Sequence, residues 1–158
     1  MIETVQNLRA KTFGNALFVE YYEWSHDEDT SKMNLIMEPI TMMTLSEYIQ
    51  YYGFLEENVI RSIWFQILSA LETLYEMSMF HGNLSINNIF VDQYNLNIKV
   101  ADYGIYNDLY GENTLDLFEG SKMDLFWLAI LLLKWLGKLR LDLPLDLGSL
   151  QYKVVMLK

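Results

Sequence analysis

Cysteine is absent from this 158-residue sequence, and proline occurs only twice. Without cysteine the chain can form no disulfide, no zinc–thiolate site and no thiolate nucleophile, which fits a reducing compartment. Basic residues are also scarce, because 11 Lys and Arg stand against 21 Asp and Glu, for a formal net charge of −10. The chain therefore lacks the basic cluster that binds nucleic-acid phosphates, and we expect no nucleic-acid partner.

Long hydrophobic runs are missing as well. The longest, residues 125–133, is too short to span a bilayer and is followed by Lys134. The N-terminal sequence MIETVQNLRAKT has no apolar core of the kind found in signal peptides. We therefore expect no membrane association and a cytoplasmic location.

What the chain does have is apolar and aromatic side chains. Apolar residues make up 52% of the sequence and aromatic residues 15%. Such a composition favours a folded chain over a disordered one, and the length fits one domain.

The N-terminal part predicts a small β-hairpin. Residues 2–9 have apolar positions at helical spacing and predict the end of a short helix. Residues 15–24 and 33–37 are rich in aromatic, β-branched and other apolar residues and predict two strands, joined by an acidic loop at 25–32. Residues 38–40 contain Pro39 and predict a linker.

Two helices are predicted next. Thr44 and Glu47 have the spacing of a capping box, so a short helix should run to about Tyr52 and stop at Gly53. A second, longer helix should begin near the acidic pair Glu56–Glu57 and extend to Met79. Its buried stripe is predicted to contain Ile60, Ile63, Trp64, Ile67, Leu68, Leu71, Leu74 and Tyr75.

The stretch from residue 80 to 104 is the centre of the sequence. A polar loop at 81–88 is followed by two short apolar runs, 89–91 and 98–101, which predict a hairpin that ends at Asp102. This arrangement would bring the amide of Asn88 and the carboxylate of Asp102 to one site. Such oxygens are suitable ligands for Mg²⁺.

The C-terminal third predicts mainly helix. Ser121 to Asp124 form a possible N-terminal cap for a helix at 123–136, which is apolar on nearly every face and should be buried. Gly137 would end it. A loop at 140–148 and a weakly amphipathic helix at 149–157 should follow.

The central stretch resembles the catalytic core of protein kinases. In that family the loop reads H-R-D-L-K-x-x-N and the metal-binding turn reads D-F-G. The positions that fit are His81, Leu84, Asn88, Asp102 and Gly104. The resemblance implies an α+β, mainly helical fold: a kinase large lobe with a remnant of the small-lobe β-sheet.

The departures from this pattern concern catalysis. Asn83 stands where the family has its catalytic Asp, and Ser85 stands in the Lys position. The resemblance therefore implies no catalytic residues, with His81, Asn83 and Ser85 as degenerate positions, and a chain that is not an enzyme. Asn88 and Asp102 would be vestigial cofactor positions: we expect no cofactor, with weak ATP and Mg²⁺ binding left open.

Other family elements set the domain boundaries. Asp124 fits the D-x-W-S-x-G opening of a buried helix, and the resemblance implies that it braces the loop at 81–83. No Gly-rich loop or V-A-I-K pattern precedes residue 15, and no A-P-E precedes Asp124. We predict a small-lobe remnant at residues 1–38 and a large lobe at 39–158, incomplete at its C-terminal end.

A narrower resemblance is to the pseudokinase region of the general-control kinases, which phosphorylate translation initiation factor 2 alpha. It implies an inactive regulatory or scaffolding module for stress response and translation control, beside an active kinase. An atypical Ser/Thr kinase whose nucleotide-binding lobe is supplied elsewhere, and a purely structural remnant, remain alternatives.

The expected partner is a protein. The predicted strands at 15–24 and 33–37 have an edge and two faces to cover, so we expect them to contact a kinase domain or a second copy of the chain. Among the four tryptophans, Trp24 is a better candidate for that surface than the others, because its predicted strand lies near a lobe boundary. The predicted core residues among the other tryptophans are Trp64, Trp127 and Trp135.

Overall fold

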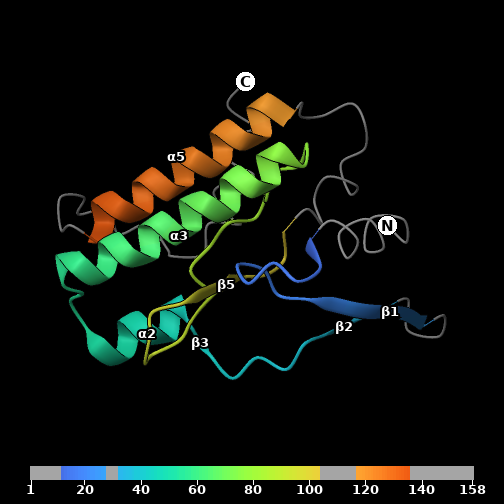
Figure 1. Ribbon diagram of the computed structural model, residues 1–158, viewed down its shortest axis with the longest axis horizontal. Helices are drawn as coiled ribbons and strands as arrows, with labels where there is room; N and C mark the ends of the chain where they lie inside the picture. The colour runs from blue at the N-terminus through green and yellow to red at the C-terminus, as the bar shows by residue number, and fades with distance from the viewer. Residues whose placement is uncertain (1–11, 28–31, 104–116, 136–158) are drawn as a thin grey trace.

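The computed structural model describes residues 12–27, 32–103 and 117–135 (Figure 1). Within these ranges lie three helices and five strands, arranged as a pair of long helices above two small sheets. The predicted helix at 2–9 and the segments predicted from Gly137 onward lie outside the described residues. The division of the chain at residue 38 stays a prediction.

Strands β1 (Tyr21–Asp27) and β2 (Lys32–Met37) form an antiparallel hairpin with a bulge between Tyr21 and Glu23. The predicted first strand began too early, because Asn15 opens a turn: its side chain accepts the N–H of Leu17 and its carbonyl accepts the N–H of Phe18. The predicted loop at 25–32 was too long. The ladder continues to its last pair, Asp27 opposite Lys32.

Helix α2 (Leu45–Tyr52) has the predicted capping box at its start. The Thr44 hydroxyl accepts the N–H of Glu47 at 3.1 Å, and the Glu47 carboxylate accepts the N–H of Thr44 at 2.8 Å. The helix ends at Gly53, whose φ of 74° is a conformation that glycine adopts at little cost. The first turn also donates from Ser46 N–H to the carbonyl of Ile86, which fixes α2 against the central loop.

Helix α3 (Glu57–Glu76) carries the predicted buried stripe, with Glu56 as its N-cap. Trp64 and Leu68 are half-buried, and Tyr75 is 50% exposed, so its predicted burial is wrong. Tyr75 lies in the last turn, directly after the buried Leu74, and the helix ends sooner than Met79. The stripe residues that are buried are Ile60, Ile63, Ile67, Leu71 and Leu74.

A three-stranded antiparallel sheet lies below α3 in Figure 1, in the order β3 (Met43–Thr44), β4 (Ile89–Val91) and β5 (Ile98–Val100). The β4–β5 hairpin was predicted, whereas β3, of only two residues, was not. Gln66 of α3 holds the hairpin at both of its amide atoms. Its Nε2 donates to the carbonyl of Leu96 at 2.8 Å, and its Oε1 accepts the N–H of Ile98 at 3.1 Å.

The linker after β2 is tied to this sheet. Lys99 Nζ donates to both carboxylate oxygens of Glu38, at 2.5 and 2.7 Å, and Glu38 also accepts the N–H of Glu20 at 2.9 Å. Burial by itself raises the pKa of Glu38, but these hydrogen bonds outweigh it and the pKa is lowered. The two sheets are also joined where Phe18 forms a parallel bridge to Val100.

Helix α5 (Leu117–Trp135) packs antiparallel beside α3 (Figure 1). It starts before the predicted cap at Ser121, and its Gly120 lies directly against the Phe80 ring: a Cβ at Gly120 would lie 2.4 Å from that ring. Trp127 and Leu131 are buried, but Phe126 is 53% exposed. The prediction of burial on nearly every face is therefore wrong, since only one side of α5 meets α3.

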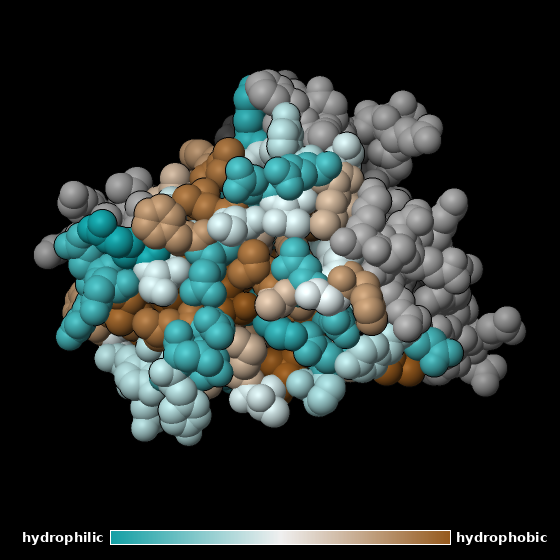
Figure 2. Space-filling model, in the orientation of Figure 1, coloured by the Kyte–Doolittle hydropathy of each residue, from teal (hydrophilic) through white to brown (hydrophobic). Residues whose placement is uncertain are grey.

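The face shown in Figure 2 carries both hydrophilic and apolar side chains. The apolar ones gather near the middle of the molecule, with hydrophilic ones around them. In the described part of the chain, no helix has the length and apolarity needed to cross a bilayer. The side chains of Trp24 and Trp135 lie outside the description.

Candidate functional site

The central loop, residues 81–88, follows α3 and is held by Asp124 of α5. The Asp124 carboxylate accepts the N–H of His81 at 2.7 Å and the N–H of Gly82 at 3.1 Å. Asp124 is only 2% exposed, and burial raises its pKa to about 7 although the two N–H groups act in the opposite direction. The Asp124 side chain of α5 thus links this helix to the loop at residues 81–88.

His81 is an internal part of the loop. It is fully buried, and burial lowers its pKa to about 4, so the imidazole is neutral near pH 7. Its Nδ1 accepts the N–H of Asn83 at 3.2 Å. The His81 imidazole therefore stabilises the loop, and because it is fully buried it cannot contact a substrate.

Asn83, at the position of the family's catalytic Asp, is half-buried. Its N–H is bound by His81 and its carbonyl accepts Asn88 Nδ2 at 2.6 Å. The main chain of this residue is therefore fixed on both sides. An amide side chain can hydrogen-bond an acceptor hydroxyl, but it cannot take up the proton as a carboxylate would.

Asn88 connects the loop to itself and to β5. Its Oδ1 accepts the N–H of Ser85 at 2.8 Å, and its carbonyl accepts the N–H of Ala101 at 2.8 Å. Ala101 immediately precedes Asp102, so the structure brings the neighbourhoods of Asn88 and Asp102 together, as the sequence predicted. Ser85, the other degenerate position, is buried, and its hydroxyl accepts the N–H of Asn87 at 3.3 Å.

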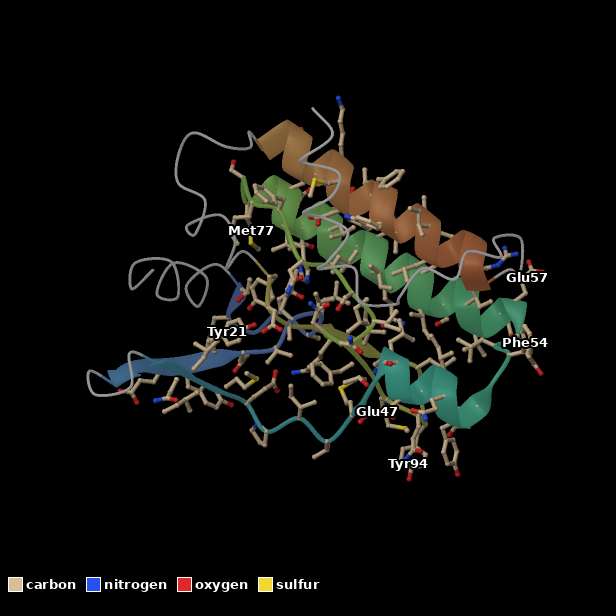
Figure 3. The ribbon with its side chains drawn as sticks, turned by 180° about the vertical axis from the view of Figure 1, so that it is seen from behind. Tyr21, Glu47, Phe54, Glu57, Met77 and Tyr94 are labelled. Atoms are coloured by element: carbon tan, nitrogen blue, oxygen red, sulfur yellow. The ribbon has the colours of Figure 1, made fainter. Side chains whose placement is uncertain are left out.

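Asp102 begins the turn after β5 with a φ of 56°. This left-handed conformation is uncommon for a residue other than glycine, and such residues concentrate at functional sites. The N–H of Asp102 donates to the hydroxyl of Tyr21 at 2.6 Å, and burial raises the pKa of the Asp102 carboxyl. Tyr21, labelled in Figure 3, comes from the start of β1 and was missed by the sequence analysis.

The residues present could supply some, but not all, of the ligands of a divalent cation. The Asn88 amide oxygen and the Asp102 carboxylate are hard oxygen ligands of the kind that Mg²⁺ takes. Among the described residues, no group of three or more His, Asp or Glu side chains is placed to hold a metal. A Mg²⁺ ion here would take its remaining ligands from water and substrate phosphates, which is its usual preference.

Comparison with known proteins identifies the family. The model of the protein kinase domain matches residues 6–129. The chain belongs to the protein kinase family. The loop at 81–88, the β4–β5 hairpin and the Asp102 turn therefore correspond in position to the catalytic loop and the D-F-G turn of the kinase fold.

Curated relatives are kinases. The chain is 28% identical over 131 residues to the mitogen-activated protein kinase kinase kinase bck1 of Aspergillus fumigatus, covering 81% of this chain and 7% of that protein. It is 36% identical over 87 residues to a probable serine/threonine-protein kinase, the KIN1 homolog of Enterocytozoon bieneusi, covering 55% and 14%. To the human NUAK family SNF1-like kinase 2 it is 33% identical over 96 residues, covering 61% and 15%. The chain thus matches a small part of each relative's length.

Solved structures show the same fold. The Neurospora crassa PAN3 pseudokinase is similar with a TM-score of 0.70 and 19% identity, covering 85% of this chain and 35% of that one. Rad53 residues 1–466, in complex with AMP-PNP, is similar with a TM-score of 0.54 and 23% identity, covering 65% and 28%. At these identities the likeness concerns the fold alone.

The relatives correct one expectation. The prediction that the chain is not an enzyme is wrong, because the curated proteins that it matches are named kinases. The prediction rested on Asn83, on Ser85 and on the absence of a Gly-rich loop and a V-A-I-K pattern before residue 15. Phosphoryl transfer depends mostly on positioning and on charge stabilisation, so one missing base removes a single contribution to the rate.

Proposed function

We propose that this chain is the large-lobe part of a serine/threonine protein kinase whose catalytic loop works without a carboxylate base. The observation that carries the proposal is the fixed geometry of residues 81–88, in which Asp124, His81 and Asn88 bind the loop's main chain from three directions. Such a loop is organised before any substrate arrives. Positioning of this kind supplies much of the catalysis in phosphoryl transfer.

The phosphates and their metal would lie at the Asn88–Asp102 side of the loop. Asn88 and Asp102 would hold Mg²⁺, which neutralises phosphate charge when bound. No Gly-rich loop precedes residue 15. The backbone cradle for the phosphates would therefore come from another segment or another chain.

Asn83 would orient the acceptor hydroxyl. Its main chain is held by hydrogen bonds to His81 and Asn88, and its side-chain amide oxygen would accept a hydrogen bond from the hydroxyl. Because the amide cannot take the proton, the rate should lack the contribution of a general base, about 10²–10⁴-fold. The expected activity is slow and depends on Asp102.

The test is a gain of function at Asn83. The natural protein, tagged and purified from its source cells with its bound partners, is incubated with radiolabelled ATP, Mg²⁺ and a generic protein substrate. Asn83→Asp should raise phosphate transfer above the wild-type rate, and Asp102→Ala should abolish it. Transfer that is the same in the wild type and in Asp102→Ala would come from a contaminating kinase and would contradict the proposal.

A regulatory role through protein contacts is the second candidate. Ile36 is 48% exposed and Tyr22 is 44% exposed, on a hairpin that pairs with no further strand among the described residues. Exposed strand edges with apolar side chains are pairing sites. A kinase domain or a second copy of the chain would bind this hairpin, and control of an adjacent stress-response kinase in translation remains part of this candidate.

Light scattering over a concentration series tests the second copy. The double change Tyr22→Asp with Ile36→Asp, at the two exposed side chains of the hairpin, should return an associating protein to the mass of a monomer. Phe65→Asp, on the exposed side of α3, is the matched control. A wild-type protein that is monomeric throughout and does not bind the kinase domains of its source cells would contradict this candidate.

A further inference from the structure

The turn that carries Asp102 is held by two tyrosine hydroxyls. Tyr103 takes the position of the Phe in the family's D-F-G, and its ring is fully buried. Its hydroxyl donates to the carbonyl of Val19 at 3.0 Å and lies 2.9 Å from Thr12 Oγ1. Since the tyrosine proton is used on Val19, the Thr12 hydroxyl is the donor in the second bond. A phenylalanine would form neither bond.

Tyr21 holds the turn from its other side. Its hydroxyl accepts the N–H of Asp102 at 2.6 Å, and its side chain is 2% exposed. The rings of Tyr21 and Tyr103 lie 5.4 Å apart between centroids, and Phe18 packs on Tyr103 at 4.8 Å. The segment from Thr12 to Tyr21 therefore contacts both residues of the turn through hydrogen bonds and ring packing.

The backbone of the turn requires such support. Asp102 has a φ of 56°, a left-handed conformation that is unfavourable for a residue other than glycine. The conformation persists where the surroundings determine it more than once. Here the determinants are the Tyr21 bond to the Asp102 N–H and the anchoring of the next residue at Val19.

We propose that Tyr21 and Tyr103 are positioning residues whose hydroxyls hold Asp102 in the orientation that a metal ligand needs. The role of Asp102 as a metal ligand rests on the proposed function. The positioning of Asp102 by the two hydroxyls is a property of the turn and does not depend on it. It also couples the segment at 12–21 to the site, because loosening Thr12 or Val19 would release the Tyr103 hydroxyl.

Amide hydrogen exchange by NMR on the whole chain measures the positioning directly. Tyr21→Phe and Tyr103→Phe each remove a hydroxyl and keep the ring, so both variants should fold. The exchange of the Asp102 N–H should rise about fivefold in each, the loss expected for one hydrogen bond. Tyr48→Phe, a buried ring in α2, is the matched control and should leave this exchange unchanged, and the N–H of Ile67 in α3 reports global opening.

A second variant separates the anchor from general loosening. In a Thr12→Val background, Tyr103→Phe should change the Asp102 exchange less than it does in the wild type, since one partner of the hydroxyl is already lost. Unchanged Asp102 exchange in both tyrosine variants, or a rise equal to that of Ile67, overturns the proposal.

Mn²⁺ binding then tests the metal separately. Paramagnetic broadening near Asp102, measured with Mn²⁺ alone, should need about tenfold more metal in Tyr21→Phe than in the wild type, as for residues that orient a ligand. If the exchange rises as expected while Mn²⁺ broadens no signal in any protein, the positioning stands and the metal part of the proposed function fails.

Discussion

The carboxylate of Asp124 accepts the backbone N–H groups of His81 and Gly82, which lie 43 and 42 residues earlier in the sequence. Each bond is buried, so neither N–H could turn to water if the carboxylate were removed. The start of the loop at residues 81–88 is therefore tied to α5 by two buried hydrogen bonds.

Asp124→Ala should destabilise the protein. It removes the acceptor of two buried N–H groups, and each loss costs about 1–3 kcal/mol, so we expect a destabilisation of about 2–6 kcal/mol. Urea denaturation followed by tryptophan fluorescence measures it. Glu72→Ala, an exposed change on α3, should alter stability by less than about 0.5 kcal/mol. Equal losses in the two variants would contradict the bracing role.

The pKa of Asp124 predicts a pH dependence. Burial raises this pKa from 3.8 to about 7, so protonation of Asp124 favours the folded state. Its stabilising contribution is complete below about pH 3.8 and is lost as the pH rises through about 7. Burial lowers the pKa of His81 from 6.5 to about 4. Its contribution to stability is therefore present above about pH 6.5 and is lost as the pH falls toward 4.

Asp124→Asn separates the two groups. The free energy of unfolding of the wild type minus that of the variant should decrease from pH 4 to pH 8, by at most on the order of 4 kcal/mol. The variant, which keeps His81, should lose stability on acidification more steeply than the wild type. Parallel pH profiles of the two proteins would show that Asp124 does not titrate in this range.

Gly120→Ala should destabilise α5 even though alanine favours helices. The added Cβ would lie 2.4 Å from the Phe80 ring, which must move. Overpacking of this kind costs about 1–3 kcal/mol, more than the gain of up to about 1 kcal/mol in helix propensity. The check is the melting temperature of Gly120→Ala in the wild type and in a Phe80→Leu background. A loss that is just as large beside the smaller leucine would rule out the steric explanation.

Gln66→Ala should loosen the β4–β5 hairpin while leaving α3 intact. The change removes the hydrogen bonds to Leu96 and Ile98, each worth about 0.5–1.5 kcal/mol. Amide exchange should therefore rise for Ile98 and its neighbours and stay unchanged for Ile63. Gln50→Ala, at an exposed position in α2, is the control. Uniform exchange changes along the chain would mean that Gln66 affects global stability alone.

Local patterns in the sequence predicted much of the fold. The capping box at Thr44 and the stripe of α3 depend on neighbours three or four residues apart, which a single sequence displays. The pairing of the Asn88 and Asp102 neighbourhoods followed from a short hairpin for the same reason.

What the sequence did not show depends on distant partners. Phe18 and Val19 pair with Val100 before β1 begins, and β3 exists only because Met43 meets Val91. Tyr21 at the site was missed because its partner is 81 residues away. The sequence held one signal that the N-terminal segment contacts this turn. Tyr103 stands where the family has Phe, and the hydroxyl of a buried tyrosine usually has a hydrogen-bond partner.

The link between Thr12–Val19 and Tyr103 has a consequence for synthesis on the ribosome. The Tyr103 hydroxyl and its Val19 acceptor are separated by 84 residues. Translation proceeds at roughly 5–20 residues per second, so Phe18 and Val19 are synthesised several seconds before the strand that buries them. During that time they are exposed, so a nascent chain of this protein should be bound by a chaperone until β5 emerges.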